Sequence, residues 1–289
     1  MLYANWSKGF KGGGWSPRPT QQNNTDLSYN PETISTFEVG SKNTFLNGKI
    51  LFNLAAFYSN YNDVQLTTIG SGATGALILL TRNVGNQRIW GLEAEFTARP
   101  APGLEFNFAG GYLNSKWNKF NRASCSAAVF DATGGNFCDT DLGKNDVPVD
   151  APKWTMTAAV QYEADLGDHG TLTPRLDASY RGKTWKDPYN LGGGVNANGA
   201  RDPRSTLGAP TPGSYYGITL PEIAQSAYWL ANARLAWRDK SEAWEVAAGV
   251  TNLFNKRYFT SILPVTTFGY DEAYAGRPRE WSLSARYKF

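Results

Sequence analysis

The 289-residue chain has few of the residues on which many catalytic and metal sites depend. It contains one histidine, His169, and only two cysteines, Cys125 and Cys138. A single histidine excludes metal motifs that need two, and it leaves little for a serine–histidine–aspartate triad. Because His169 lies in the turn-like stretch LGDHG, we interpret it as a solvated turn residue. The sequence therefore predicts no enzyme, no metal site and no cofactor.

Long hydrophobic runs and blocks of positive charge are also missing. The best apolar run, residues 75–80, is far shorter than the roughly 18 residues of a membrane-spanning helix. A net charge of +3 without a block of Lys or Arg gives no footprint for nucleic acid. Residues 1–15 lack the basic and then apolar pattern of a signal peptide, so we expect the beginning of an exported protein to be missing. Helical membrane proteins and nucleic-acid binders are excluded.

Aromatic residues and glycine, in contrast, are abundant. The chain has 10 Trp, 15 Tyr, 15 Phe and 30 Gly, yet its mean hydropathy is only −0.43. This mixture is typical of a lipid-facing barrel, because apolar and polar residues alternate along each strand and cancel in the average.

A two-residue alternation of apolar and polar side chains predicts about ten β-strands. Residues 87–99 are an example, since Trp90, Leu92 and Phe96 alternate with Glu93 and Glu95. The same pattern recurs at 104–115, 153–163, 171–181 and 279–289, and more weakly at 2–10, 34–45, 49–62, 226–237 and 243–252. Strands of roughly 9–12 residues suit a tilted bilayer crossing.

The connections between these strands alternate in length. Short turns such as FLNGK and RDKSE alternate with long segments rich in Gly, Pro, Asn, Ser and Thr, at about 11–31, 64–85, 119–150, 185–222 and 257–277. Outer-membrane barrels have short periplasmic turns and longer extracellular loops. The sequence therefore predicts an all-β, antiparallel transmembrane β-barrel.

The two faces of the predicted sheet differ in composition. Aromatic residues cluster near strand ends on the apolar face, as expected for the girdles of a membrane barrel: Trp90, Tyr112, Trp154, Tyr162, Tyr180, Trp237, Trp244 and Trp281. The lumen face carries charges of both signs: Glu38, Lys42, Glu93, Glu95, Lys153, Glu163, Arg175, Asp177, Arg181, Glu245, Glu280 and Arg286. The alternative is a large secreted β-sandwich with its aromatic residues in the core.

Two further motifs have residues that could carry chemistry. Cys125 and Cys138 fall in one long segment, where an exported protein would form a disulfide, with free thiols as the alternative. The stretch GSGATG at 70–75 has the spacing of a dinucleotide-binding loop, but too short an apolar run follows for the helix that such a site needs. We interpret these residues as loop glycines.

Several stretches resemble TonB-dependent outer-membrane receptors, in the carboxy-terminal part of the barrel. They are LYANWSKGFKGGGW at 2–15, YNPETISTFEVGSK at 29–42, LFNLAAFYSNYNDVQ at 51–65, NVGNQRIWGLEAEF at 83–96, VTNLFNKRYF at 250–259 and the terminal GRPREWSLSARYKF. The order and spacing of these stretches across the chain carry the resemblance.

The resemblance implies that residues 1–289 form the last part of a 22-stranded barrel whose lumen holds a plug. The plug domain, the TonB box and the first strands are absent, as expected for a fragment or a split reading frame. The lumen-facing charges would then line the wall against which the plug packs. Trp281, Tyr287 and the terminal Phe289 would form the signal read by the barrel-assembly machinery.

The resemblance also implies a receptor in the outer membrane of a Gram-negative bacterium, surrounded by outer-membrane lipid. Such receptors take up a ferric siderophore, another metal chelate or another nutrient, with energy from the TonB complex. Ligand capture would fall to the long loops, where Trp185, Tyr189, Tyr215 and Tyr216 are candidates from segment 185–222. A passive pore or adhesion barrel, or a small outer-membrane enzyme, is the alternative.

Overall fold

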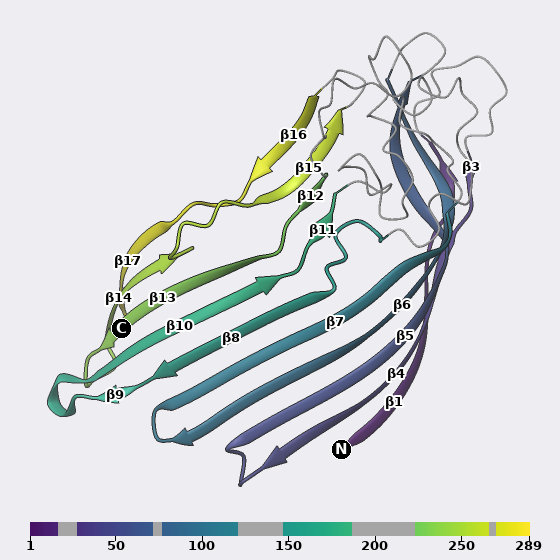
Figure 1. Ribbon diagram of the computed structural model, residues 1–289. Coiled ribbons are helices and arrows are strands. Elements are labelled where there is room, and N and C mark those ends of the chain that lie inside the picture. Colours follow the sequence, from purple (N-terminus) through teal and green to yellow (C-terminus); the bar gives the residue numbers. More distant parts are fainter. Residues whose placement is uncertain (17–27, 72–76, 121–146, 187–222, 266–269) are drawn as a thin grey trace.

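A single large antiparallel sheet makes up most of the described chain (Figure 1). The computed structural model describes residues 1–16, 28–71, 77–120, 147–186, 223–265 and 270–289. Ten strands follow one another across the sheet: β1 (Leu2–Lys11), β4 (Glu32–Phe45), β5 (Ile50–Ser71), β6 (Leu77–Ala101), β7 (Leu104–Phe120), β8 (Trp154–Tyr162), β10 (Thr171–Arg181), β13 (Tyr228–Arg238), β14 (Trp244–Thr251) and β17 (Glu280–Tyr287). The expectation of about ten antiparallel strands is confirmed.

Smaller elements surround this sheet. The short strand β9 (Ala164–Asp165) pairs with β10, and the 3₁₀ turn η1 (Gly167–His169) follows it. Three two-stranded sheets lie outside the main one: β2 (Gly14–Trp15) with β3 (Ser28–Tyr29), β11 (Thr184–Trp185) with β12 (Ala224–Gln225), and β15 (Phe259–Val265) with β16 (Tyr270–Ala275). In the described ranges, no helix has the length and apolar character needed to cross a membrane.

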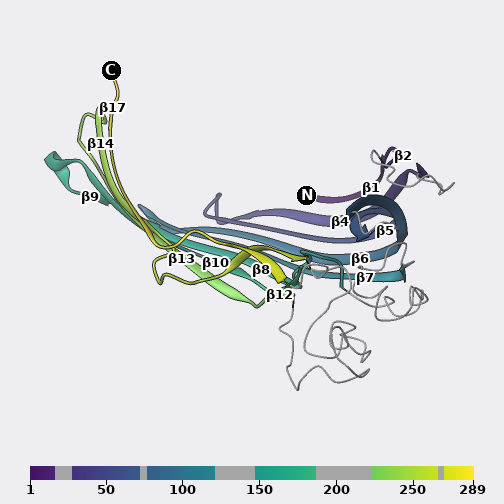
Figure 2. The same ribbon diagram turned by 90° about the horizontal axis from the view of Figure 1, so that it is seen from above.

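The sheet is curved but not closed. Figure 2 shows it from above as a trough, with β1 and β17 at its two ends. Among the described residues, β1 pairs only with β4 and β17 pairs only with β14. Both outer strands therefore leave backbone hydrogen-bonding groups along one side free to pair with further strands.

Where the structure describes them, the tight turns that join neighbouring strands of the main sheet lie at one end of the sheet. Residues 46–49 join β4 to β5, and Leu46, Asn47 and Gly48 all have positive φ there. Gly103, in the turn between β6 and β7, has a φ of 75°, and a Cβ at this position would lie 2.2 Å from the Glu163 carbonyl oxygen. These local sequences reverse the chain within a few residues, as the short-turn end of the sheet requires.

Two segments interpreted as loops contain extended hairpins instead. The segment at 64–85 continues β5 as far as Ser71 and begins β6 at Leu77, so this hairpin extends well beyond its neighbours. The segment at 257–277 contains the β15–β16 hairpin. Their turn-forming residues concealed the strands, because a two-residue period is hard to recognise between Gly and Asn residues.

The strand register separates an apolar face from a polar one. One row of register partners on the convex face crosses six strands: Ala4, Val39, Ala56, Leu92, Tyr112 and Trp154. The predicted girdle aromatics all lie on this face, and rings contact one another between Trp90 and Tyr112 at 5.3 Å and between Tyr112 and Trp154 at 4.7 Å. Their predicted placement is confirmed.

The concave face carries the side chains at the strand positions that alternate with the convex-face residues. The predicted lumen charges that fall within strands occupy these alternate positions, while Lys153 and Glu163 flank β8. Ala158 on the convex face is paired with Phe108 and Ala178, whereas Ala159 is paired with Asn107 and Asp177. Adjacent positions in β8 thus meet opposite environments.

Candidate functional site

The concave face is a continuous polar wall, and hydrogen bonds between strands organise it. Near its short-turn end, Arg99 Nε donates to Glu105 Oε2 at 2.7 Å, and Asn107 Nδ2 donates to Glu105 Oε1 at 2.7 Å. Thr97 Oγ1 extends this hydrogen-bond network by donating to Asn107 Oδ1 at 2.9 Å. Both carboxylate oxygens of Glu105 therefore have partners, and this part of the wall is held in one arrangement.

A second network continues towards β17. Arg175 donates from Nη1 to Gln161 Oε1 at 2.9 Å, and Asn232 Nδ2 donates to Asp177 Oδ2 at 2.6 Å. Further along, Arg234 and Arg238 both bind Glu245, at 2.8 and 3.3 Å. The sequence predicted mixed charges on this face but not these pairings, because they depend on strand register.

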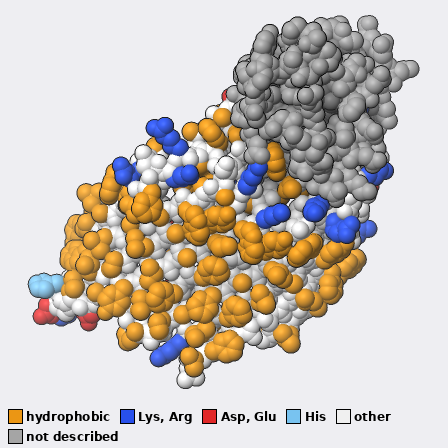
Figure 3. Space-filling view, in the orientation of Figure 1, with side chains coloured by type: hydrophobic (Ala, Val, Ile, Leu, Met, Phe, Trp, Pro, Cys, Tyr) orange, Lys and Arg blue, Asp and Glu red, His pale blue; other side chains and the backbone are white. Residues whose placement is uncertain are grey.

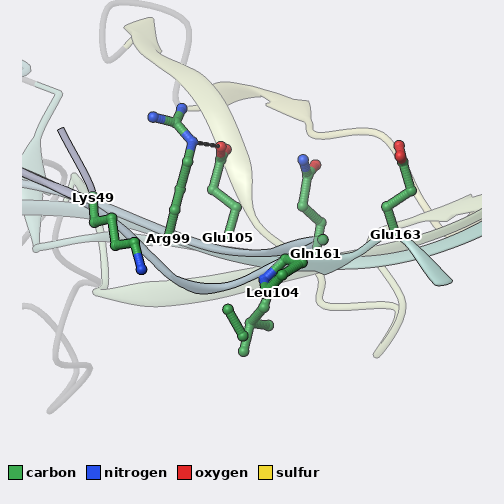
Figure 4. Close-up of a pocket in the computed structure, with 9 residues that line it drawn as sticks. Lys49, Arg99, Leu104, Glu105, Gln161 and Glu163 are labelled. Carbon is green, nitrogen blue, oxygen red and sulfur yellow. Dashed lines mark hydrogen bonds and ion pairs between the residues drawn. The ribbon is translucent and has the colours of Figure 1, made fainter. Parts of the chain in front are cut away.

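A pocket of about 450 Å³ lies on the concave face near the short-turn end. Figure 4 shows Arg99, Glu105, Gln161 and Glu163 projecting from one side of the sheet, while Leu104 points to the other. Lys49 completes the polar lining from the neighbouring turn. This open, charged hollow suits contact with another polar surface better than it suits a small apolar ligand.

At the opposite end, the structure describes one of the predicted ligand-binding aromatics. Trp185 lies in β11, partly exposed, with the Lys183 ammonium 4.2 Å from its ring centroid. Tyr189, Tyr215 and Tyr216 lie outside the described residues, as do Cys125 and Cys138. The long segments that carry these residues begin at the same end of the sheet as β11 (Figure 1).

The terminal strand has the predicted aromatic positions on the convex face. Trp281 is paired with Val250, and Tyr287 is paired with Trp244, whose ring centroid lies 4.7 Å from that of Tyr287. Phe289 makes an edge contact with Tyr287 at 5.1 Å. Their recognition by an assembly machinery stays a prediction.

The lone histidine belongs to the short-turn end. His169 ends η1, is exposed, and accepts a hydrogen bond on its backbone oxygen from Trp237 Nε1 at 2.8 Å. Within the described ranges, no three His, Cys, Asp or Glu side chains gather closely enough to hold a metal ion.

Sequence reasoning missed a buried cluster at the long-segment end. Trp117 and Phe120 at the end of β7 pack with Val64, Val84 and Ile223, and Phe120 is only 1% exposed. These residues are scattered along the sequence, and the strand period is broken by a bulge between Asn86 and Gln87. A register shift of this kind gives no signal in the alternation pattern.

Asn252 is a second residue that the sequence analysis did not single out. It is 4% exposed with a φ of 48°, and its Nδ2 donates to the carbonyls of Lys256 at 2.9 Å and Arg277 at 3.0 Å. Its Oδ1 accepts from the Lys256 amide at 2.8 Å. Asn252 thus connects the end of β14 to the segment before β17.

Asp239 organises the turn between β13 and β14. Its side chain accepts hydrogen bonds from the Ser241 hydroxyl and from the Trp244 amide at 2.7 Å. These donors, Ser241 first, lower the pKa of Asp239 below its usual range. A carboxylate with a lowered pKa contributes stability above its usual titration range and loses it as the pH falls through the lowered pKa.

We therefore expect Asp239→Ala to lower the urea midpoint of the protein at pH 7. The difference from wild type should shrink under acid conditions, where Asp239 is protonated in both folded and unfolded chains. The control is Asp168→Ala in the neighbouring turn, which removes only an exposed ion pair with Lys240. Equal midpoints for wild type and Asp239→Ala at pH 7 would refute the role assigned to Asp239.

Comparison with known proteins identifies the family. A model described as TonB dependent receptor-like, beta-barrel, matches residues 1–253. The ferric yersiniabactin uptake receptor FyuA from Yersinia pestis aligns over 100% of this chain and 35% of its own, with a TM-score of 0.68 and 20% identity. The ferric preacinetobactin receptor BauA from Acinetobacter baumannii aligns over 100% and 34%, with a TM-score of 0.60 and 20% identity.

A metal transporter has the same fold. The copper transporter OprC aligns over 100% of this chain and 37% of its own, with a TM-score of 0.61 and 16% identity. The chain spans about a third of the length of these structures. The two-faced sheet and its strand register agree with the family match. This chain belongs to the TonB-dependent receptor-like β-barrel family.

Proposed function

We propose that this chain forms the carboxy-terminal part of the barrel wall of an outer-membrane receptor that takes up an extracellular ligand with energy from TonB. The observation that carries the proposal is the two-faced sheet, with an apolar convex face, a polar concave face and long segments at one end. The free sides of β1 and β17 would pair with the remaining strands of a 22-stranded barrel. The concave wall, including the pocket around Glu105, would then face the plug.

We infer the ligand class from the relatives and from the chemistry near Trp185. The relatives named above are receptors for ferric yersiniabactin and ferric preacinetobactin and a transporter of copper. An indole ring with the Lys183 ammonium over its face presents both a stacking surface and a positive charge. A ferric siderophore with aromatic, anionic chelating groups suits this pair, so ferric chelates are the first candidates.

An uptake experiment tests this proposal. Cells that lack the gene should lose accumulation of the radiolabelled metal from one member of a panel containing a ferric catecholate, a ferric hydroxamate and copper(II). Uptake should also stop when TonB is deleted. Accumulation that continues without TonB, together with steady conductance of the protein in a planar bilayer, would instead identify a passive pore.

Trp185→Ala tests the assigned capture site. Loss of a ring that stacks on the ligand should weaken binding of the transported chelate about tenfold, measured by fluorescence titration. Trp229→Ala is the matched control, because Trp229 is 54% exposed on the convex face. Equal weakening by both variants, or no change with Trp185→Ala, would exclude Trp185 as a ligand contact.

A further inference from the structure

A row of positive side chains crosses the convex face just beyond its apolar area. Successive register partners on β1, β4, β5, β6 and β7 are Lys8, Ser35, Asn60, Arg88 and Lys116. Lys8, Arg88 and Lys116 are exposed on the same face as Trp6 and Trp90. Figure 3 shows this face, with hydrophobic side chains across its middle and Lys and Arg side chains gathered along its upper border. We call Lys8, Arg88 and Lys116 the basic row.

The basic row has no acidic partner on its own face. Arg88 and Lys116 are directly opposite each other in the register, and like charges in this position repel. Among the described strand residues that a continuous register places on the convex face of β1 to β8, none is Asp or Glu, and Asp63 lies at the bulge where the register of β5 shifts. Arg88 Nη2 instead donates to the neutral Asn118 Oδ1 at 3.2 Å. An anion supplied from outside the chain would relieve this repulsion.

An apolar groove lies directly below the basic row. It has a volume of about 450 Å³, and its lining includes Leu92, Phe108, Tyr112, Trp154 and Met156. Gly110 at its floor has no side chain, and a Cβ there would lie 2.9 Å from the Phe108 ring. Trp90 lines the groove and lies two residues below Arg88 on β6, so the positive charge and the groove are adjacent. At about 3.3 Å per residue, the separation is about 7 Å.

We propose that the basic row and the groove together bind a phosphate-bearing lipid of the outer leaflet. The phosphate lies between Arg88 and Lys116, with Asn60 and Asn118 as neutral donors, and an acyl chain occupies the groove over Gly110. Charge complementarity selects the phosphate, and the groove selects a lipid over a free anion. The proposal rests on the outer-membrane location proposed above.

Native mass spectrometry can test the site on the protein purified from outer membranes in detergent. The probe is a bisphosphorylated glycolipid of the lipid A type, compared with its dephosphorylated form. Loss of one cation near an anionic lipid weakens binding about fivefold. Arg88→Gln combined with Lys116→Gln should therefore weaken binding of the phosphorylated glycolipid about 30-fold. Lys49→Gln is the control, because it removes one positive charge at the short-turn end, against two in the double variant. It should change binding less than twofold.

Two further arms identify the source of the phosphate. Gly110→Leu should weaken binding of the phosphorylated glycolipid by filling the groove, and excess inorganic phosphate should not displace it. Displacement by inorganic phosphate would show a free-anion site and overturn the lipid assignment. Binding by the double variant equal to wild type, or equal binding of both glycolipids, would also overturn it. Recovery of the protein without detergent would instead contradict the proposed membrane location.

Discussion

Ala158→Arg should lower the free energy of unfolding by about 2–4 kcal/mol, the cost of a charge near the midplane of a bilayer on the lipid face of a barrel. Ala158 is near the middle of β8, opposite Phe108 and Ala178 on the convex face, and no acidic residue is paired with it. The measurement is urea unfolding of the protein in lipid vesicles.

The matched variant is Ala159→Arg, one residue along the same strand. Asn107 and Asp177 are its register partners, so the guanidinium has polar neighbours and a carboxylate within reach on the concave face. We expect a cost below about 1 kcal/mol, in the range of surface substitutions. Equal costs for the two variants would contradict the assignment of faces in β8.

Asn252→Ala should destabilise the protein by about 3 kcal/mol. The substitution removes the side-chain donors to the Lys256 and Arg277 carbonyls and the acceptor of the Lys256 amide in a buried position. Each lost hydrogen bond costs about 1 kcal/mol net, and alanine tolerates the φ of 48° less well than asparagine. Urea midpoints measure the change.

Asn255→Ala is the control for this prediction. Asn255 has a similar φ of 51°, but it is exposed, and its side chain accepts one hydrogen bond, from the Arg279 amide at 3.1 Å. We expect a cost of about 1 kcal/mol. If both variants cost the same, the buried hydrogen bonds of Asn252 do not hold β14 to the segment before β17.

The strands and their faces could be predicted from the sequence because both follow from a period of two. Alternation of Trp90, Leu92 and Phe96 with Glu93 and Glu95 fixes which side of β6 is apolar without knowledge of its neighbours. The ends of the strands were harder to predict from the sequence. Nothing in the composition of 64–85 distinguishes a long hairpin from a loop, because the pairing of β5 with β6 stabilises it.

The interactions that connect strands could not be predicted. Glu105 and Arg99 are close in sequence, but Asp177 and Asn232 meet only because β10 and β13 pair in one particular register. The two asparagines in VTNLFNKRYF illustrate the same limit. The motif carries the family resemblance, and the reason for Asn252 is evident only when the Arg277 carbonyl is placed beside it.

The central claim is that the convex face of this sheet contacts lipid, and a single accessibility measurement tests it most directly. A nitroxide label is attached to a cysteine at position 158 or at position 159, with Cys125 and Cys138 replaced by serine, and the protein is reconstituted in a bilayer. Collision with oxygen dissolved in the lipid should be frequent for the label at 158, and a water-soluble relaxation agent should reach the label at 159 instead. Equal exposure to oxygen at both positions, or greater exposure at 159, would contradict the account.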